Sequence, residues 1–153
     1  MSARAIAMTI LVAEDDPDDR ALARDAFAEA RVPNRIDFVE DGEELLAYLR
    51  NEGRYADSGA YPSPGLILLD LNMPRLGGRE ALAEIKSDPT LRHIPIVVMT
   101  TSRANDDVIA SYQSGTNSYI TKPASFQSLL DVVRALRRYW MEVVDLPAVN
   151  EEH

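Results

Sequence analysis

The feature that most constrains the fold is an alternation of short apolar runs with segments whose apolar residues recur at helical spacing. Near-continuous runs of Ile, Leu, Val and Met are typical of strands covered on both faces of a parallel sheet. The predicted strands are Met8–Ala13, Ile36–Val39, Leu66–Leu69, Ile94–Met99 and the more polar Ser118–Thr121. Strand and helix alternate five times, which predicts an α/β protein with a doubly wound, five-stranded parallel sheet and helices on both faces.

Helix boundaries have recognisable signals. Asp16-Pro17 places a capping residue before a proline at the first helical position, and Asp18 and Asp19 are expected only to complement the helix dipole. The stretch of about Gly53–Gly65 is interpreted as a loop inserted between the second helix and the third strand. Two further helices are indicated by apolar residues at helical spacing. The fourth helix contains Val108, Ile109 and Tyr112. The last helix has one apolar stripe, formed by Phe126, Leu129, Leu130, Val133, Leu136, Trp140 and Val144.

Composition narrows the classes of function. The chain has 153 residues and a formal net charge of −9, so nucleic acid and anionic membrane surfaces are not expected as partners. There is no cysteine, and the two histidines, His93 and His153, lie far apart in the sequence. Disulfides, thiolate metal sites and cysteine catalysis are therefore excluded. The apolar stretch Ile6–Ala13 is too short to span a membrane and runs directly into carboxylates, so we expect a cytoplasmic protein.

Chemically active side chains follow four of the predicted strands. Glu14 and Asp15 follow the first strand, Asp70 the third, Thr100 the fourth and Lys122 the fifth. Because the carboxyl ends of parallel strands meet at one edge of a sheet, these groups are expected to converge there. Clustered carboxylates disfavour joint ionisation without a cation, and oxygen-only ligands of this kind suit Mg²⁺. A lysine and a hydroxyl opposite them would bind the oxygens of a transferred phosphoryl group.

Each of these residues also has a structural explanation when taken alone. Asp70 could be an aspartate that ends a strand in a turn, and Lys122 could be a solvated surface lysine. Their joint position at one sheet edge favours a functional site.

The motifs resemble the receiver domain of two-component response regulators, the CheY-like family. The segments that carry the resemblance are Glu14-Asp15-Asp16-Pro17, Leu69-Asp70-Leu71-Asn72-Met73-Pro74, Met99-Thr100-Thr101 and Lys122-Pro123. The resemblance covers about residues 8–140 and implies the flavodoxin-like strand order 2-1-3-4-5. Residues 141–153 would then be a C-terminal helix extension and tail, with no separate effector domain.

The resemblance also implies roles for individual residues. Asp70 would be the phosphoacceptor, and Asp15 and Asp70 would bind Mg²⁺ through their side chains. The backbone carbonyl of Asn72 would be the third protein ligand, with Glu14 acting through water.

Three further roles follow from the same resemblance. Lys122 would pair with the phosphoryl group, the Thr100 hydroxyl would move to bind it, and Tyr119 would be the aromatic switch residue. The Lys122-Pro123 peptide bond would be cis. Such a protein catalyses only its own phosphotransfer and dephosphorylation and is not otherwise an enzyme.

A finer similarity concerns the single-domain regulators paired with phytochromes. It rests on the Gly53–Gly65 insertion, residues 79–86, residues 118–123 and the aromatic tail at 139–147. It implies a histidine kinase of the bacteriophytochrome type as phosphodonor, with output through protein contacts. A homodimer is expected because Trp140, Val143 and Val144 extend an apolar stripe beyond the sheet.

Two other classes of function were weighed. A Mg²⁺-dependent phosphatase with an aspartyl nucleophile would need a second aspartate two residues after the first, where this chain has Asn72. A non-phosphorylated interaction module with the same fold would be expected to lack part of the acidic cluster or the lysine. This chain has both the acidic cluster and the lysine.

Overall fold

The computed structural model describes residues 8–71, 73, 77–100 and 118–139, and the account below is confined to them. These residues form one five-stranded sheet in the order β2-β1-β3-β4-β5, with parallel pairing throughout. The strands are β1 (Ile10–Ala13), β2 (Ile36–Val39), β3 (Leu66–Asp70), β4 (Ile96–Thr100) and β5 (Ser118–Thr121). The predicted fold class and strand order are confirmed.

The strand register fixes which residues meet at the carboxyl edge of the sheet. Ala13 on β1 pairs with Leu69 on β3, so the next residues, Glu14 and Asp70, lie side by side at the carboxyl edge, with Asp70 as the last residue of β3. Thr100 ends β4 opposite Thr121 on β5. Residues from the first, third and fifth strands are therefore delivered to one edge, as the sequence predicted.

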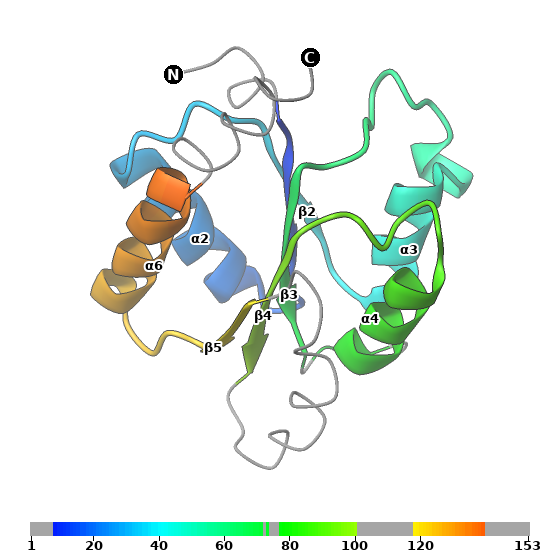
Figure 1. Cartoon of the computed structure of the whole chain (residues 1–153). Helices are drawn as coiled ribbons and strands as arrows, with labels where there is room; N and C mark the ends of the chain where they lie inside the picture. Colours follow the sequence, from blue (N-terminus) through cyan, green and yellow to red (C-terminus); the bar gives the residue numbers. More distant parts are fainter. Residues whose placement is uncertain (1–7, 72, 74–76, 101–117, 140–153) are drawn as a thin grey trace, which may run out of the picture.

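Four α-helices and one short 3₁₀ helix lie among the described residues. They are α2 (Pro17–Glu29), α3 (Gly42–Arg50), η1 (Gly53–Tyr55), α4 (Gly78–Ser87) and α6 (Phe126–Tyr139). Figure 1 shows α2 and α6 together on one face of the sheet and α3 with α4 on the other. The expected helix at Val108–Tyr112 and the extension of the last helix to Val144 lie outside the described residues. Across the part of the chain described, no helix is long and apolar enough to cross a membrane.

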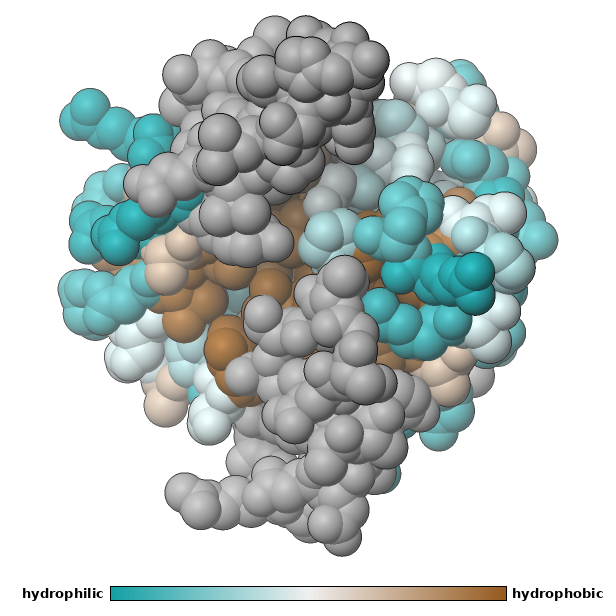
Figure 2. Space-filling view, viewed as in Figure 1, coloured by the Kyte–Doolittle hydropathy of each residue, from teal (hydrophilic) through white to brown (hydrophobic). Residues whose placement is uncertain are grey.

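The sheet separates two hydrophobic cores. The core on the α3–α4 side includes Leu45 and Leu49 of α3 and Leu82 and Ile85 of α4. The core on the α2–α6 side is built from fewer buried residues, among them Phe27 of α2. Figure 2 shows hydrophilic side chains on the outer faces at both sides and apolar side chains between the two helical layers. Both faces of the sheet are thus covered, which explains why β1 and β3 are apolar at nearly every position.

The boundaries of three strands differ from the prediction, and β3 and β4 each end one residue later than expected, at Asp70 and Thr100. β1 begins at Ile10, two residues after Met8, and β4 begins at Ile96, two residues after Ile94. The N–H of Ile94 donates to the carbonyl oxygen of Leu91 in a turn (3.0 Å), and Pro95 has no N–H to give to the ladder. Apolar character therefore continues into the turn although strand pairing does not.

One backbone expectation is wrong. There is no cis peptide bond among the described residues, so the Lys122–Pro123 bond is trans. The trans form of an X–Pro bond is favoured by about 0.5–1 kcal/mol unless the surrounding structure selects the cis form.

The inserted loop after α3 packs around three tyrosines. The ring centroids of Tyr55 and Tyr61 lie 4.9 Å apart, and both rings contact that of Tyr48 on α3. Asn51 ends α3 in the left-handed conformation (φ 54°), and its side-chain amide donates to the carbonyl oxygens of Tyr55 and Tyr61. The insertion is thereby fixed to the α3–α4 side of the molecule.

Candidate functional site

The loop between β1 and α2 brings two acidic residues to the sheet edge and is held by backbone contacts. Asp16 caps α2, and Pro17 occupies its first turn as predicted. The guanidinium Nη1 of Arg20 donates to the carbonyl oxygens of both Glu14 and Asp15, at 2.9 Å each. The carboxylate of Glu14 accepts from the N–H of Asp16 (3.2 Å). Both acidic residues are therefore presented by a loop whose backbone is anchored to α2.

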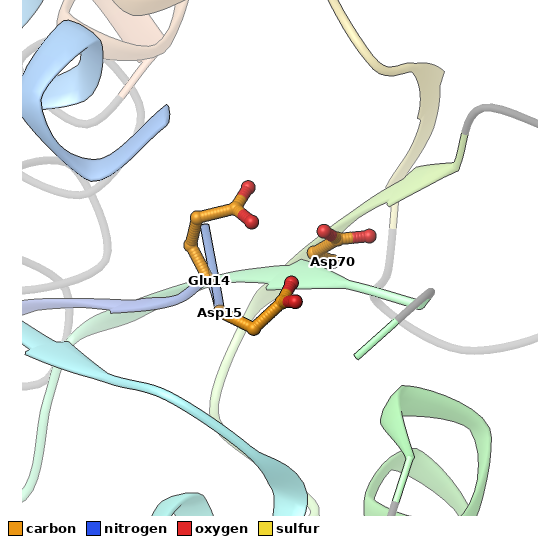
Figure 3. A group of neighbouring side chains, drawn as sticks. All are labelled: Glu14, Asp15 and Asp70. Carbon is orange, nitrogen blue, oxygen red and sulfur yellow. The ribbon is translucent and has the colours of Figure 1, made fainter. Parts of the chain in front are cut away.

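Three carboxylates meet at the carboxyl edge of the sheet. Glu14, Asp15 and Asp70 each place one oxygen so that these oxygens all lie within 4.8 Å of one another. Figure 3 shows the three side chains gathered at the ends of β1 and β3. Glu14 and Asp70 are buried and Asp15 is partly exposed. Hard oxygen donors at this spacing fit a divalent cation such as Mg²⁺ or Mn²⁺, which would also offset their mutual repulsion.

The ammonium group of Lys122 contacts three carboxylates. Its Nζ is 2.8 Å from Oε1 of Glu14, 2.9 Å from Oδ2 of Asp70 and 2.9 Å from Oδ2 of Asp19. The expectation that Asp19 serves only the helix dipole is therefore wrong, because its side chain contacts the site lysine. Asp18, one residue earlier, is exposed and fits the expectation. The sequence signal that could have found Asp19 is its position one turn after the acidic loop, on the face of α2 toward the sheet edge.

This arrangement raises the pKa values of both Glu14 and Lys122. The shift favours the neutral form of the glutamate and the charged form of the lysine. The pKa of Glu14 is raised to about 7: burial is the largest cause and the charge of Asp70 adds to the rise, against the lowering effect of the hydrogen bond from Lys122. Burial alone would lower the pKa of Lys122. Its hydrogen bonds to Glu14, Asp19 and Asp70 outweigh burial and hold that pKa above its ordinary value. The lysine is therefore a fixed positive charge at neutral pH.

A cavity opens beside Lys122, between α2 and α6. Asp19 and Lys122 line it at one end, and apolar side chains including Leu22, Phe27 and Leu129 line the rest. The cavity lies on the side of the sheet that has the smaller core. Lys122 therefore has its alkyl chain against apolar surface and its ammonium group among carboxylates, as is usual for partly buried lysines.

A glycine allows α4 to begin directly behind Asp70. A Cβ added to Gly78 would lie 2.5 Å from the carbonyl oxygen of Asp70 and 2.6 Å from Cα of Leu71. Such distances are too short for any side chain. Gly78 is therefore required for the close packing of α4 against the backbone that carries Asp70.

Three predicted site residues are Asn72, Thr100 and Tyr119. Asn72 lies outside the described residues, and Thr100 and Tyr119 are described through their strands only. Thr100 ends β4 at the predicted edge, and Tyr119 lies within β5 opposite Val98. The imidazole-bearing residue His93 is exposed, in agreement with its interpretation as a surface residue.

The fold and site define a class before any comparison is made. A doubly wound parallel sheet of order 2-1-3-4-5 places its ligand site at the switch point between β1 and β3, where Glu14, Asp15 and Asp70 lie. This is a flavodoxin-like α/β protein whose described site is acidic and contains a partly buried lysine, Lys122.

Comparison with known proteins identifies the family. The model of the response regulator receiver domain matches residues 10–134. The response regulator Rcp1 of Synechocystis sp. is 42% identical over 139 residues, covering 91% of this chain and 92% of Rcp1. The crystal structure of the phosphorylated cyanobacterial phytochrome response regulator RcpA is similar with a TM-score of 0.78 and 46% identity, covering 89% of this chain and 95% of RcpA. The Mn²⁺-bound form of Rcp1 gives a TM-score of 0.76 at 40% identity, covering 89% of this chain and 96% of Rcp1.

The chain belongs to the response regulator receiver domain family. It is a two-component signalling domain related to the phytochrome response regulators and not a conventional enzyme. The resemblance inferred from the motifs is thereby confirmed.

Proposed function

We propose that this protein accepts a phosphoryl group on Asp70 from the phosphohistidine of a histidine kinase, in the presence of Mg²⁺. The observation that carries the proposal is the contact of Asp70 with both halves of the site. One carboxylate oxygen of Asp70 lies 2.9 Å from Nζ of Lys122, and the group also includes an oxygen within 4.8 Å of Glu14 and Asp15. A nucleophile between a cation site and a lysine suits phosphoryl transfer, which depends on positioning and on neutralising charge.

In this reaction an oxygen of Asp70 attacks the phosphorus, the P–N bond to the kinase imidazole breaks, and an acyl phosphate forms. Mg²⁺, held by the side chains of Asp15 and Asp70 and the carbonyl of Asn72, with Glu14 acting through water, would neutralise charge on the phosphoryl oxygens. Lys122 contributes a fixed positive charge whose Nζ lies 2.9 Å from Oδ2 of Asp70.

The response to phosphorylation is assigned to the neighbouring strands. Thr100 ends β4, which pairs directly with the strand of Asp70, and Tyr119 lies in β5 next to it. We propose that the Thr100 hydroxyl binds the phosphoryl group and that Tyr119 is the switch residue whose ring follows it. Output would then pass through contacts with another protein.

The proposed kinase is of the bacteriophytochrome type. The similarity to RcpA, a cyanobacterial phytochrome response regulator, supports this pairing. A homodimer formed through Trp140, Val143 and Val144 and a location in the cytoplasm stay predictions, since those residues lie outside the described part of the chain.

The test compares wild type, Asp70→Asn and Asp25→Asn after incubation with acetyl phosphate and Mg²⁺. Asp25 is an exposed aspartate on α2 and provides the matched control. Intact mass is expected to show one added phosphoryl group in wild type and in Asp25→Asn and none in Asp70→Asn. Labelling of Asp70→Asn, or no labelling of wild type, would contradict the proposal.

The kinase assignment needs a separate experiment. Purified, autophosphorylated histidine kinases with and without bilin-binding sensor domains are each mixed with the protein, and transfer of labelled phosphate is followed over time. The fastest transfer is expected from a bilin-binding kinase. Preferential transfer from kinases without such a sensor would contradict the phytochrome pairing while leaving Asp70 as the phosphoacceptor.

A further inference from the structure

The three carboxylates around Lys122 differ in what else they do. Glu14 and Asp70 also belong to the group of oxygens suited to a divalent cation, whereas Asp19 does not. Their burial differs as well: the side chain of Asp19 is 36% exposed, against 4% for Glu14 and 2% for Asp70. Asp19 also comes from a separate element, the first turn of α2.

A lysine ammonium has three hydrogens to donate and no acceptor. In this structure the three short contacts of Nζ go to Glu14, Asp19 and Asp70. A phosphoryl oxygen arriving on Asp70 can bind Lys122 only if one of these acceptors gives way. Asp70 stays beside Lys122 because the phosphoryl group is attached to it, and Glu14 is buried among the oxygens suited to the cation. Asp19 is partly exposed and can be hydrated where it lies, so its contact with Lys122 costs least to break.

We propose that Asp19 is a positioning residue that holds Lys122 in the unphosphorylated protein and yields its place to a phosphoryl oxygen when Asp70 is phosphorylated. This inference rests on the proposed function of Asp70. Asp19 therefore competes with the incoming phosphoryl group for Lys122. The carboxylate fixes the ammonium group beforehand, and breaking that contact adds to the cost of the transfer.

The cavity between α2 and α6 supports the exchange. Asp19 and Lys122 both line it together with Glu14, so there is open space beside the ammonium group and the carboxylate. Removing the carboxylate should therefore favour the transfer and leave the fold intact.

The test uses Asp19→Asn with Asp18→Asn as its matched control. Both variants remove one negative charge from the same helical turn, but the Asp18 side chain is exposed and that of Asp19 contacts Lys122. At subsaturating acetyl phosphate with Mg²⁺, the labelling rate of Asp19→Asn is expected to rise about fivefold, as for a partly exposed ion pair of about 1 kcal/mol. Asp18→Asn is expected to stay within about twofold of wild type, because an exposed charge acts weakly. The charge-retaining variant Asp19→Glu is expected to fall between wild type and Asp19→Asn.

A double-mutant cycle shows whether the effect passes through Lys122. Lys122→Met is expected to slow labelling strongly, and adding Asp19→Asn to Lys122→Met is expected to change the rate no further. A general electrostatic effect on the anionic phosphodonor would instead accelerate both backgrounds equally. That result would overturn the inference.

The remaining outcomes separate this inference from the proposed function. Equal rates for Asp19→Asn, Asp18→Asn and wild type, or slower labelling of Asp19→Asn, would overturn the role of Asp19 while Asp70 remains the phosphoacceptor. No labelling of wild type would contradict the proposed function, and the inference with it. Circular dichroism melting of each variant checks that the compared proteins are folded. If Asp19→Asn is not folded, Asp19→Glu is compared with wild type in its place.

Discussion

The two faces of the sheet are packed in different ways. On the α3–α4 face, residues from both helices are buried against the sheet, and the tyrosines of the insertion close over them. On the α2–α6 face the buried core formed by the described residues is smaller, and a cavity lined by Asp19 and Lys122 lies between the helices. The two faces therefore have different roles. Packing on the α3–α4 face stabilises the fold, and the cavity on the α2–α6 face leaves space in which charged groups can exchange partners.

Polar contacts follow the same division. On the α3 side, the hydroxyl of Tyr48 donates to Asp37 (2.5 Å), which also pairs with Arg35 (3.0 Å). This network is local and lies away from the carboxyl edge of the sheet. On the α2–α6 side, carboxylates from separate elements converge on Lys122. A change in charge at the site therefore alters ion pairs on the α2–α6 side directly.

The largest expected effect concerns core packing. Leu82 of α4 is fully buried, whereas Leu129 of α6 is partly exposed and lines the cavity. Leu82→Ala is expected to lower the free energy of unfolding by about 3–5 kcal/mol, and Leu129→Ala by about 1–2 kcal/mol, because little packing is lost beside an existing cavity. Urea denaturation of both variants measures this. Equal losses would show that the two faces are packed alike.

The next effect is a pH dependence that originates at the site. The pKa of Glu14 is about 7 in the folded protein, above its ordinary value of 4.5, so the folded state binds more protons than the unfolded state between these values. Stability of the metal-free protein is expected to fall by about 1–3 kcal/mol as pH rises from 5 to 8. Lys122 adds no slope there, because its raised pKa leaves it protonated in both states.

Urea denaturation at several pH values measures this slope, with Glu14→Gln as the control. The substitution is expected to flatten the profile, since it removes the titrating carboxyl group. Mg²⁺ is expected to restore stability at pH 8, because a cation bound to the carboxylates favours their ionised form. A rise in stability over this interval, or the same slope in Glu14→Gln, would contradict the assignment.

The smallest effect tests whether the two faces are independent. Tyr48→Phe removes one hydrogen bond to Asp37 and keeps the ring contacts, so it is expected to cost about 1 kcal/mol of stability. Tyr61→Phe, on a partly exposed ring in the same cluster, is expected to cost less. Neither should alter the rate at which acetyl phosphate labels the protein. A changed labelling rate in Tyr48→Phe would show that the α3 side is coupled to the site.

Much of the fold could be predicted because its signals are local. The apolar runs of β1 and β3 mark buried strands, and Asp16-Pro17 marks the start of α2. Convergence of Glu14 and Asp70 then follows from parallel pairing alone. The start of β4 was misplaced because Ile94 is buried in a turn, and burial is visible in the sequence where pairing is not.

What escaped prediction at the site depends on distant contacts. Asp19 lies in the first turn of a helix, where acidic residues are common, and its contact with Lys122 depends on the packing of α6 against α2. Arg20 likewise gave no signal that its guanidinium would hold two backbone carbonyls. The trans bond before Pro123 also depends on context, since both isomers are close in energy.

The contact between Lys122 and Asp70 has a consequence for biosynthesis. The two residues are 52 positions apart, so Asp70 leaves the ribosome roughly 3–10 s before Lys122 at usual rates of synthesis. During that interval the nascent chain already carries Glu14, Asp15, Asp19 and Asp70 without the lysine that pairs with three of them. The acidic edge of the sheet therefore gains its paired lysine only after β5 has been synthesised.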